Sequence, residues 1–200
     1  MIRFAVMLVL VVSMTNPALS DDHRTRRRLP AFGLQSGYGF QNGLDVSYHY
    51  EVVFLKMKTF YTIYGTGKWS FDLVPQPQVN ISRYKVTNNS AKTDHGIEFG
   101  VNVGFAFMRY FDAGHTGLYI MAGAGPHYVS GVPERQAPGF ILSDNVALGF
   151  TGLLSDRLAL DLSAGFRHIS NASLKRPNGG VNNLVVMGGV VVQLGIINYQ

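Results

Sequence analysis

Apolar and polar residues alternate with a period of two along most of the chain beyond residue 30. The clearest stretch is 97–108, where one set of alternate positions is apolar or aromatic and the other set is polar or small. The segments 140–150 and 158–167 repeat this pattern. Successive side chains of a β-strand point to opposite faces, so the pattern predicts strands with one apolar face. No apolar run beyond residue 30 is long enough for a transmembrane helix.

Glycine, proline, asparagine and aspartate separate the alternating segments and indicate turns. We expect eight strands, near 31–40, 48–60, 68–78, 97–109, 117–130, 139–151, 157–171 and 182–196. The second is open, because 44–64 is long enough to contain two strands. Long loops are expected at 79–95, including Asn80, and at 131–138.

The composition favours a barrel in lipid over a soluble β-protein. Charged residues make up 14% of the chain, and the less apolar face is rich in Gly, Ala, Ser and Asn. Such a face suits the narrow interior of a small closed barrel whose apolar face meets lipid. A soluble sandwich or a lipocalin-like barrel would carry a well-charged exterior. The sequence therefore predicts an all-β, eight-stranded antiparallel outer-membrane β-barrel over residues 31–200.

The N-terminus predicts export. A short basic start, the apolar run Phe4–Val12 and small residues before Ser20 are typical of a secretory signal peptide over residues 1–20, cleaved near Ser20. A basic tail follows at 21–30, which could bind anionic lipid phosphates or simply be solvated. The chain has no cysteine and so no disulfide framework. An exported protein of this kind is not expected to bind nucleic acid.

The first candidate for chemistry is a histidine and a serine, His168 and Ser170, at the end of an expected strand. Alternate strand residues share a face, with Cα atoms roughly 6.6 Å apart, so the two side chains could lean together as base and nucleophile. They fall on the same face as Leu162 and Phe166, the face assigned to lipid. Ionisable groups facing lipid are rare and usually functional. The alternative is that the pair lies in the headgroup region, where polar residues are ordinary.

The residues around this pair carry a longer motif. His168-Ile169-Ser170-Asn171-Ala172, followed by Leu174-Lys175-Arg176-Pro177-Asn178-Gly179-Gly180, resembles the lipid A deacylase (PagL, acyloxyacyl hydrolase) family. The resemblance implies an eight-stranded outer-membrane barrel with its active site on the lipid-facing surface. It also implies a serine esterase that removes an ester-linked acyl chain from lipid A in lipopolysaccharide, surrounded by outer-membrane lipid.

The resemblance assigns roles to several residues. His168 would be the base and Ser170 the nucleophile, while the side chains of Asn171 or Asn178 could stabilise the oxyanion together with nearby backbone N–H groups. Two further residues could pair with lipid A phosphates or be solvated loop charges: Lys175 and Arg176.

The third catalytic member departs from the family. Where the family motif carries a glutamate, this chain has Asn182. An asparagine can hold an imidazole in one tautomer but cannot neutralise the imidazolium. Asp144 could substitute as the acid, because it lies on the preceding strand and on the same face. The alternative function is a non-enzymatic small outer-membrane barrel with a degenerate motif.

No metal or other cofactor is predicted. The remaining histidines lack ligand-like spacing, namely His23, His49, His95, His115 and His127. A homodimer is compatible with the sequence, which does not decide the oligomeric state.

Overall fold

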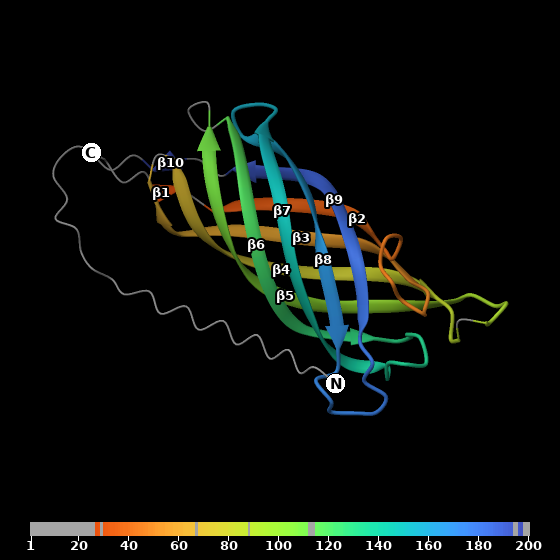
Figure 1. The fold of residues 1–200 in the computed structure, drawn as a ribbon. Coiled ribbons are helices and arrows are strands. Elements are labelled where there is room, and N and C mark those ends of the chain that lie inside the picture. Colours follow the sequence, from red (N-terminus) through yellow and green to blue (C-terminus); the bar gives the residue numbers. More distant parts are fainter. Residues whose placement is uncertain are drawn as a thin grey trace.

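The fold is a closed, tilted barrel of antiparallel strands (Figure 1). The structure is a computed structural model that describes residues 27–28, 30–66, 68–87, 89–111, 115–193 and 196–197. The signal peptide expected at 1–20, its cleavage near Ser20 and most of the basic tail lie outside the described residues.

Eight strands form the barrel, and each is hydrogen-bonded to its sequence neighbours, with β2 and β9 closing the ring. They are β2 (Ala31–Phe40), β3 (Tyr50–Gly65), β4 (Trp69–Tyr84), β5 (Asp94–Phe111), β6 (Thr116–Val129), β7 (Gly139–Leu153), β8 (Leu158–Ser170) and β9 (Val181–Gln193). Two short strands, β1 (Arg27–Arg28) and β10 (Ile196–Ile197), pair with each other outside the barrel. The predicted eight-stranded barrel is confirmed.

The structure differs from the sequence-based expectation in two segments, 44–64 and 79–95. Residues 44–64 contribute one strand to the sheet, β3, because 41–49 forms turns closed by backbone bonds such as Leu44 N–H to the Gln41 carbonyl. The loop expected at 79–95 was too long, since β4 continues to Tyr84. Asn80 is fully buried inside the barrel, where its amide donates to the Glu98 carboxylate at 2.9 Å. A buried partner therefore extends the strand through a segment whose composition favours a loop.

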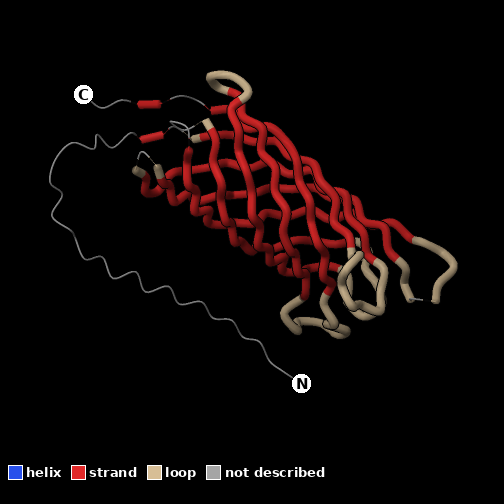
Figure 2. Tube along the Cα trace, turned by 45° about the horizontal axis from the view of Figure 1, so that its top comes forward, coloured by secondary structure: helices blue, strands red, loops and turns tan. Residues whose placement is uncertain are grey.

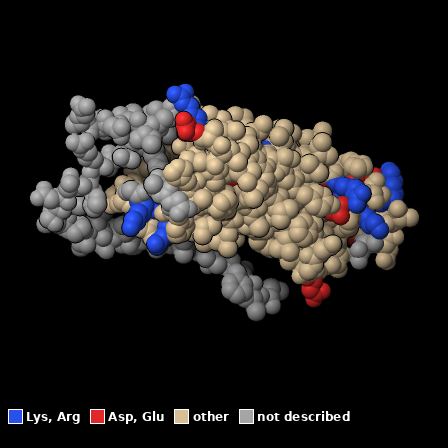
Figure 3. Space-filling model, turned by 90° about the horizontal axis from the view of Figure 1, so that it is seen from above, with Lys and Arg blue, Asp and Glu red and all other residues tan. Residues whose placement is uncertain are grey.

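The outer wall is apolar and the lumen is polar. On β5, the outward side chains of Phe99, Phe105 and Phe107 are about half exposed, whereas Glu98 and Asn102 point inward and are buried. On the face seen in Figure 3, charged side chains gather at the two ends of the molecule, and the wall between them is almost free of charge. An apolar outer band over a polar interior is typical of a β-barrel in a bilayer. The described residues contain no helix long and apolar enough to span a membrane.

The two ends of the barrel differ (Figure 2). The longer connections, at 41–49, 85–93, 130–138 and 171–180, lie together at what we call the loop end. The shorter ones, at 66–68, 112–115 and 154–157, lie at the turn end, where β2 begins and β9 finishes. Strand β8 reaches the loop end at Ser170, so the candidate motif lies there.

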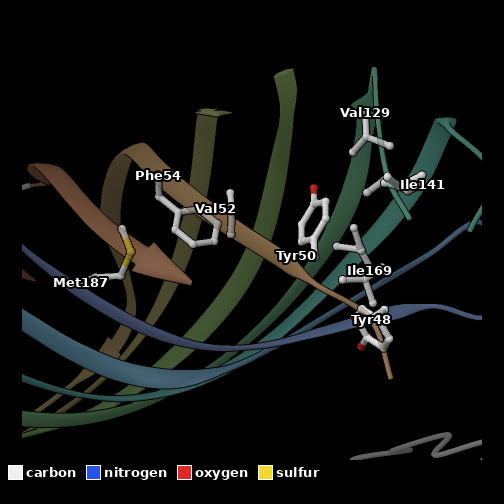
Figure 4. Close-up of a cluster of buried hydrophobic side chains, with 10 residues drawn as sticks. Tyr48, Tyr50, Val52, Phe54, Val129, Ile141, Ile169 and Met187 are labelled. Atoms are coloured by element: carbon white, nitrogen blue, oxygen red, sulfur yellow. The ribbon is translucent and has the colours of Figure 1, made fainter. Parts of the chain in front are cut away.

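Buried apolar side chains close the lumen near the loop end (Figure 4). Tyr50, Phe54, Ile141 and Ile169 are essentially inaccessible to solvent. Ile169 stands between His168 and Ser170 in the sequence. Burying an isoleucine side chain contributes about 1.5–3 kcal/mol, and a one-residue slip of β8 would turn it outward. The inward position of Ile169 therefore fixes the outward direction of both neighbours.

Candidate active site

The histidine of the motif lies on the outer wall of the barrel. Phe166 and Leu162 on the same face of β8 are 36% and 44% exposed, whereas Arg167 is 2% exposed and points inward. His168 is half-buried and lies close to the loop end. The prediction that this face of β8 points away from the lumen is confirmed.

His168 forms a short hydrogen bond with the third candidate residue. In the sheet register, His168 of β8 lies directly opposite Asn182 of β9. The imidazole Nδ1 and the Asn182 Oδ1 are 2.6 Å apart. An amide oxygen only accepts, so Nδ1 carries the proton and Nε2 keeps a free lone pair. Asn182 thus holds the tautomer in which His168 can act as a base.

Asn182 is itself held by the first long loop. Its backbone N–H donates to the Tyr48 hydroxyl at 2.7 Å, and its carbonyl accepts from the Gln41 side-chain amide at 3.1 Å. Gln41 is in turn fixed by the Tyr50 N–H, which donates to its Oε1 at 2.8 Å. Residues more than a hundred positions away in the chain therefore fix the backbone of the residue that orients His168.

Asp144 flanks His168 on the opposite side. It is the register partner of His168 on β7 and is exposed. Directly opposed residues of an antiparallel pair have Cβ atoms about 5 Å apart. In the described part of the chain, Asp144 forms no ion pair or hydrogen bond with His168. The structure therefore brings both candidate third members beside the imidazole, and the hydrogen bond is made by Asn182.

Ser170 is the last residue of β8 and is half-buried beside its register partner Leu142. Among the described residues, neither the Ser170 hydroxyl nor His168 Nε2 has a hydrogen-bond partner. The two side chains share a face, and catalytic hydrogen bonds are often long before substrate binds and tighten in the complex. The hydroxyl of Ser170 and Nε2 of His168 are therefore both uncommitted on one face of β8.

The two asparagines after the strand organise the loop 171–180. Asn171 is buried, and its Nδ2 donates to the carbonyls of Lys175 at 2.7 Å and Pro177 at 3.5 Å. Asn178 accepts the Asn171 backbone N–H through Oδ1 at 3.0 Å and donates one amide hydrogen to the Ser173 hydroxyl at 3.2 Å. The second amide hydrogen of Asn178 remains for another acceptor, whereas both of those of Asn171 are used within the loop.

The two basic residues of the motif are exposed. Lys175 and Arg176 lie in the loop 171–180, and within the described residues neither forms an ion pair. Elsewhere at the loop end, Lys92 pairs with Asp94 at 3.0 Å, and this hydrogen bond raises the pKa of Lys92. Lys175 and Arg176 are therefore the basic side chains beside the motif that remain open to an external anion.

A glycine packs directly against the imidazole. Gly180 has a φ of +66°, and a Cβ at this position would lie 2.5 Å from His168 Cε1. Its N–H donates to the Gln136 side chain at 3.1 Å, and Arg135 donates to the Gly179 carbonyl at 2.5 Å. The loop 130–138 therefore fixes the segment that limits the movement of the His168 ring.

Comparison with known proteins identifies the family. The family model described as lipid A 3-O-deacylase (PagL) matches residues 55–190, which is most of the chain and includes the segment from His168 to Asn182. The chain belongs to the lipid A 3-O-deacylase (PagL) family. No curated protein sequence matches it.

Three solved structures resemble this member of the PagL family. The crystal structure of the outer membrane enzyme PagL has a TM-score of 0.60 and 14% identity, covering 82% of this chain and 99% of that one. Neisserial surface protein A has a TM-score of 0.46 and 14% identity, with 82% and 95% covered. The outer membrane protein OprG from Pseudomonas aeruginosa has a TM-score of 0.47 and 11% identity, with 86% and 99% covered. The likeness to PagL shows a shared fold.

Sequence reasoning missed the supporting residues of this PagL-family site. Tyr48 and Gln41 come from the loop 41–49, and Gln136 comes from the loop 130–138. Nothing local in the sequence marks them, because they reach the site only through barrel closure and loop packing. Within the motif itself, the sequence does not show that Gly180 packs against His168.

Proposed function

We propose that the chain is an outer-membrane esterase that removes an ester-linked acyl chain from lipid A with His168 and Ser170. One observation carries the proposal: Asn182 orients the imidazole on the outer wall at the loop end, on the same face as Ser170. Membership of the PagL family and the apolar outer wall support it. A site on that wall meets the headgroup region of the leaflet, where the ester bonds of lipid A lie.

The chemistry follows from the tautomer that Asn182 selects. His168 Nε2 takes the proton of the Ser170 hydroxyl as Oγ attacks the acyl carbonyl. The tetrahedral intermediate collapses when His168 returns the proton to the departing sugar oxygen, which leaves as the alcohol. An acyl-serine ester remains, and His168 then deprotonates a water molecule that attacks it. The products are a fatty acid and the restored Ser170.

Asn182 and Asp144 divide the role of the missing acid. Asn182 orients His168 but, being neutral, gives little stabilisation to the imidazolium formed during each attack. Asp144 is the nearest carboxylate by register and is the alternative source of that stabilisation, reduced by its exposure to solvent. We therefore assign Asn182 as the orienting member of the site and retain Asp144 as the substitute acid.

Asn178 is the better oxyanion donor of the two asparagines. Its second amide hydrogen is uncommitted, whereas Asn171 uses its amide hydrogens to hold the loop 171–180. We assign Asn178 to the oxyanion and Asn171 to the shape of the loop. Lys175 and Arg176 are exposed beside them and would bind the lipid A phosphates as charged donors.

Mass spectrometry of lipid A tests the proposal. Cells lacking other lipid A deacylases would express the wild type, Ser170→Ala or the control Ser155→Ala, whose serine is exposed at the turn end. We expect lipid A to lose one ester-linked acyl chain with the wild type and the control, and to keep it with Ser170→Ala. Heat-modifiable electrophoretic mobility would confirm that each barrel is folded.

Covalent labelling provides an independent measurement. A fluorophosphonate should modify the folded wild type at Ser170, and His168→Ala should prevent the modification. Full deacylation by Ser170→Ala would overturn the assignment of the nucleophile. A folded wild type that neither deacylates lipid A nor reacts with the label would favour the non-enzymatic barrel.

A further inference from the structure

The lumen of the barrel contains a small cavity that is separate from the outer wall and that the proposed esterase does not use. It offers about 30 Å³ to the centres of water-sized particles. This is room for two or three such particles, since one water needs roughly 10–15 Å³ by the same measure. Its lining combines apolar residues such as Phe54 and Met187 with polar side chains of the barrel interior, among them Gln35, Lys56 and Asn145.

Lys56 is the unusual member of this lining. Its register partners are Gln35 on β2 and Gln78 on β4, so its side chain points into the lumen, and it is only 7% exposed. Within the described residues, its ammonium group has no hydrogen-bond acceptor and no carboxylate partner. Its Nζ lies 5.7 Å from the centroid of the Phe54 ring. A buried charge without a partner is costly.

The neighbouring charges do not supply that partner. Lys58 is paired with Asp161 at 3.1 Å, and Arg167 is paired with Glu98 at 2.7 Å. The buried Asp72 is six residues from Gln78 along β4, toward the turn end. Three cations therefore line the cavity, and two of them are paired with carboxylates, which leaves the positive charge of Lys56 without a partner in the described residues.

Two uncharged donors line the same cavity. The side-chain amides of Gln35 and Asn145 are buried, and within the described residues neither the nitrogen nor the oxygen of either amide has a hydrogen-bond partner. A buried donor left unsatisfied costs about 1–3 kcal/mol. One acceptor placed among Lys56, Gln35 and Asn145 would satisfy all three groups, and a negative charge on it would balance the charge of Lys56.

We propose that the lumen binds one small monovalent anion, chloride, at Lys56 with the amides of Gln35 and Asn145 as the other donors. The volume excludes a lipid carboxylate with its chain. The single charge matches the single unpaired lysine. The anion stabilises the barrel from inside and takes no part in the proposed ester hydrolysis.

Thermal unfolding in detergent tests the proposal. The wild type, Lys56→Met and the control Lys68→Met, an exposed lysine at the turn end, would be compared in sodium chloride and in sodium gluconate at equal concentration. Gluconate is too large for the cavity. At a chloride concentration of ten times Kd, we expect the Tm of the wild type and the control to rise by about 3–6 °C over gluconate. Lys56→Met should show the same Tm in both salts.

Bromide diffraction gives a direct readout that does not depend on a variant folding. Crystals of the wild type grown in bromide should show an anomalous peak beside Lys56 in the lumen. Absence of that peak together with equal Tm values in chloride and gluconate would overturn the proposal in favour of a neutral or hydrated Lys56. A chloride response retained by folded Lys56→Met would overturn the assignment of the site.

Discussion

Arg167 and His168 are neighbours in the chain, yet they belong to two polar clusters on opposite sides of one barrel wall. Inside, Arg167 donates to both carboxylate oxygens of Glu98 and to the Ser143 hydroxyl, and Glu98 also accepts from Tyr50. Outside, His168 donates to Asn182, and its second nitrogen has no partner among the described residues. In the inner cluster the charges of Arg167 and Glu98 are paired, whereas in the outer one a ring nitrogen of His168 has no partner among the described residues.

The difference between the inner and outer clusters corresponds to two different requirements, one for the stability of the barrel and one for the proposed chemistry. Fully satisfied buried networks rigidify a fold, because every broken contact leaves a buried polar group unpaired. A catalytic base needs the opposite condition, a lone pair that is oriented but unused. Substitutions on the two sides of the wall should therefore affect different measured quantities.

The largest effect is expected on the outside. Under the proposed mechanism, His168→Ala should lower fatty-acid release by more than about 1,000-fold, because Ser170 would lose its base, while the Tm changes little for a half-buried side chain. Release from a purified lipid A substrate measures the first quantity, and thermal unfolding in the same detergent measures the second. Activity within tenfold of the wild type would remove His168 from the mechanism.

Substitutions in the inner cluster should change the free energy of unfolding of the barrel. Arg167→Met leaves the Glu98 carboxylate buried without its cation, which should reduce the free energy of unfolding by about 3–5 kcal/mol. Urea titration of the barrel in detergent measures it. Replacing both partners, with Glu98→Leu added, should recover part of the loss. Equal stability of the wild type and the single variant would contradict the structural role of the pair.

The contact between Gly180 and the imidazole predicts an intermediate effect. Gly180→Ala should lower kcat by about 10–100-fold, because the new methyl group displaces the His168 ring. Gly139→Ala is the matched control, since Gly139 has a φ of +105° but open space around its Cβ position. Both variants carry backbone strain, so only the difference in kcat between them reports on the ring. Equal kcat values would show that the contact is unimportant.

Because residue 182 is an asparagine and not an acid, one substitution there should raise activity. Asn182→Glu should raise activity by roughly tenfold, because a carboxylate on Nδ1 stabilises the imidazolium formed as Ser170 is deprotonated. If Asp144 already supplies that charge, Asn182→Glu should change little and Asp144→Asn should be the damaging substitution. Rates of fatty-acid release by the two variants distinguish the cases. Activity unchanged in both would leave His168 and Ser170 as a dyad.

The smallest effect should come from the support of Asn182. Tyr48→Phe removes the hydroxyl that accepts the Asn182 N–H, a hydrogen bond worth about 1 kcal/mol, so kcat should fall about fivefold. The KM should not change, because Tyr48 acts through Asn182. A rise in KM with constant kcat would place Tyr48 in substrate binding instead.

Much of the barrel could be predicted from the sequence because its strands alternate strongly. On β8, the inward Ile169 and the outward Phe166 specify the face of His168 without further information. The end of β4 was harder, because Asn80 looks like a loop residue until Glu98 is placed opposite it. Tyr48, Gln41 and Gln136 could not be predicted, since their contacts depend on how loops distant in sequence pack together.

The apolar plug of Tyr50, Phe54, Ile141 and Ile169 has a consequence for kinetics. It fills the lumen beside the site, so no lipid approaches through the barrel interior, and a lipid reaches the outer wall by diffusing sideways within its leaflet. The encounter is then two-dimensional. Under the proposed function, the rate depends on the mole fraction of substrate among the surrounding lipids, and adding inert lipid slows turnover at constant bulk concentration. The released fatty acid enters the same leaflet and competes for the same stretch of wall.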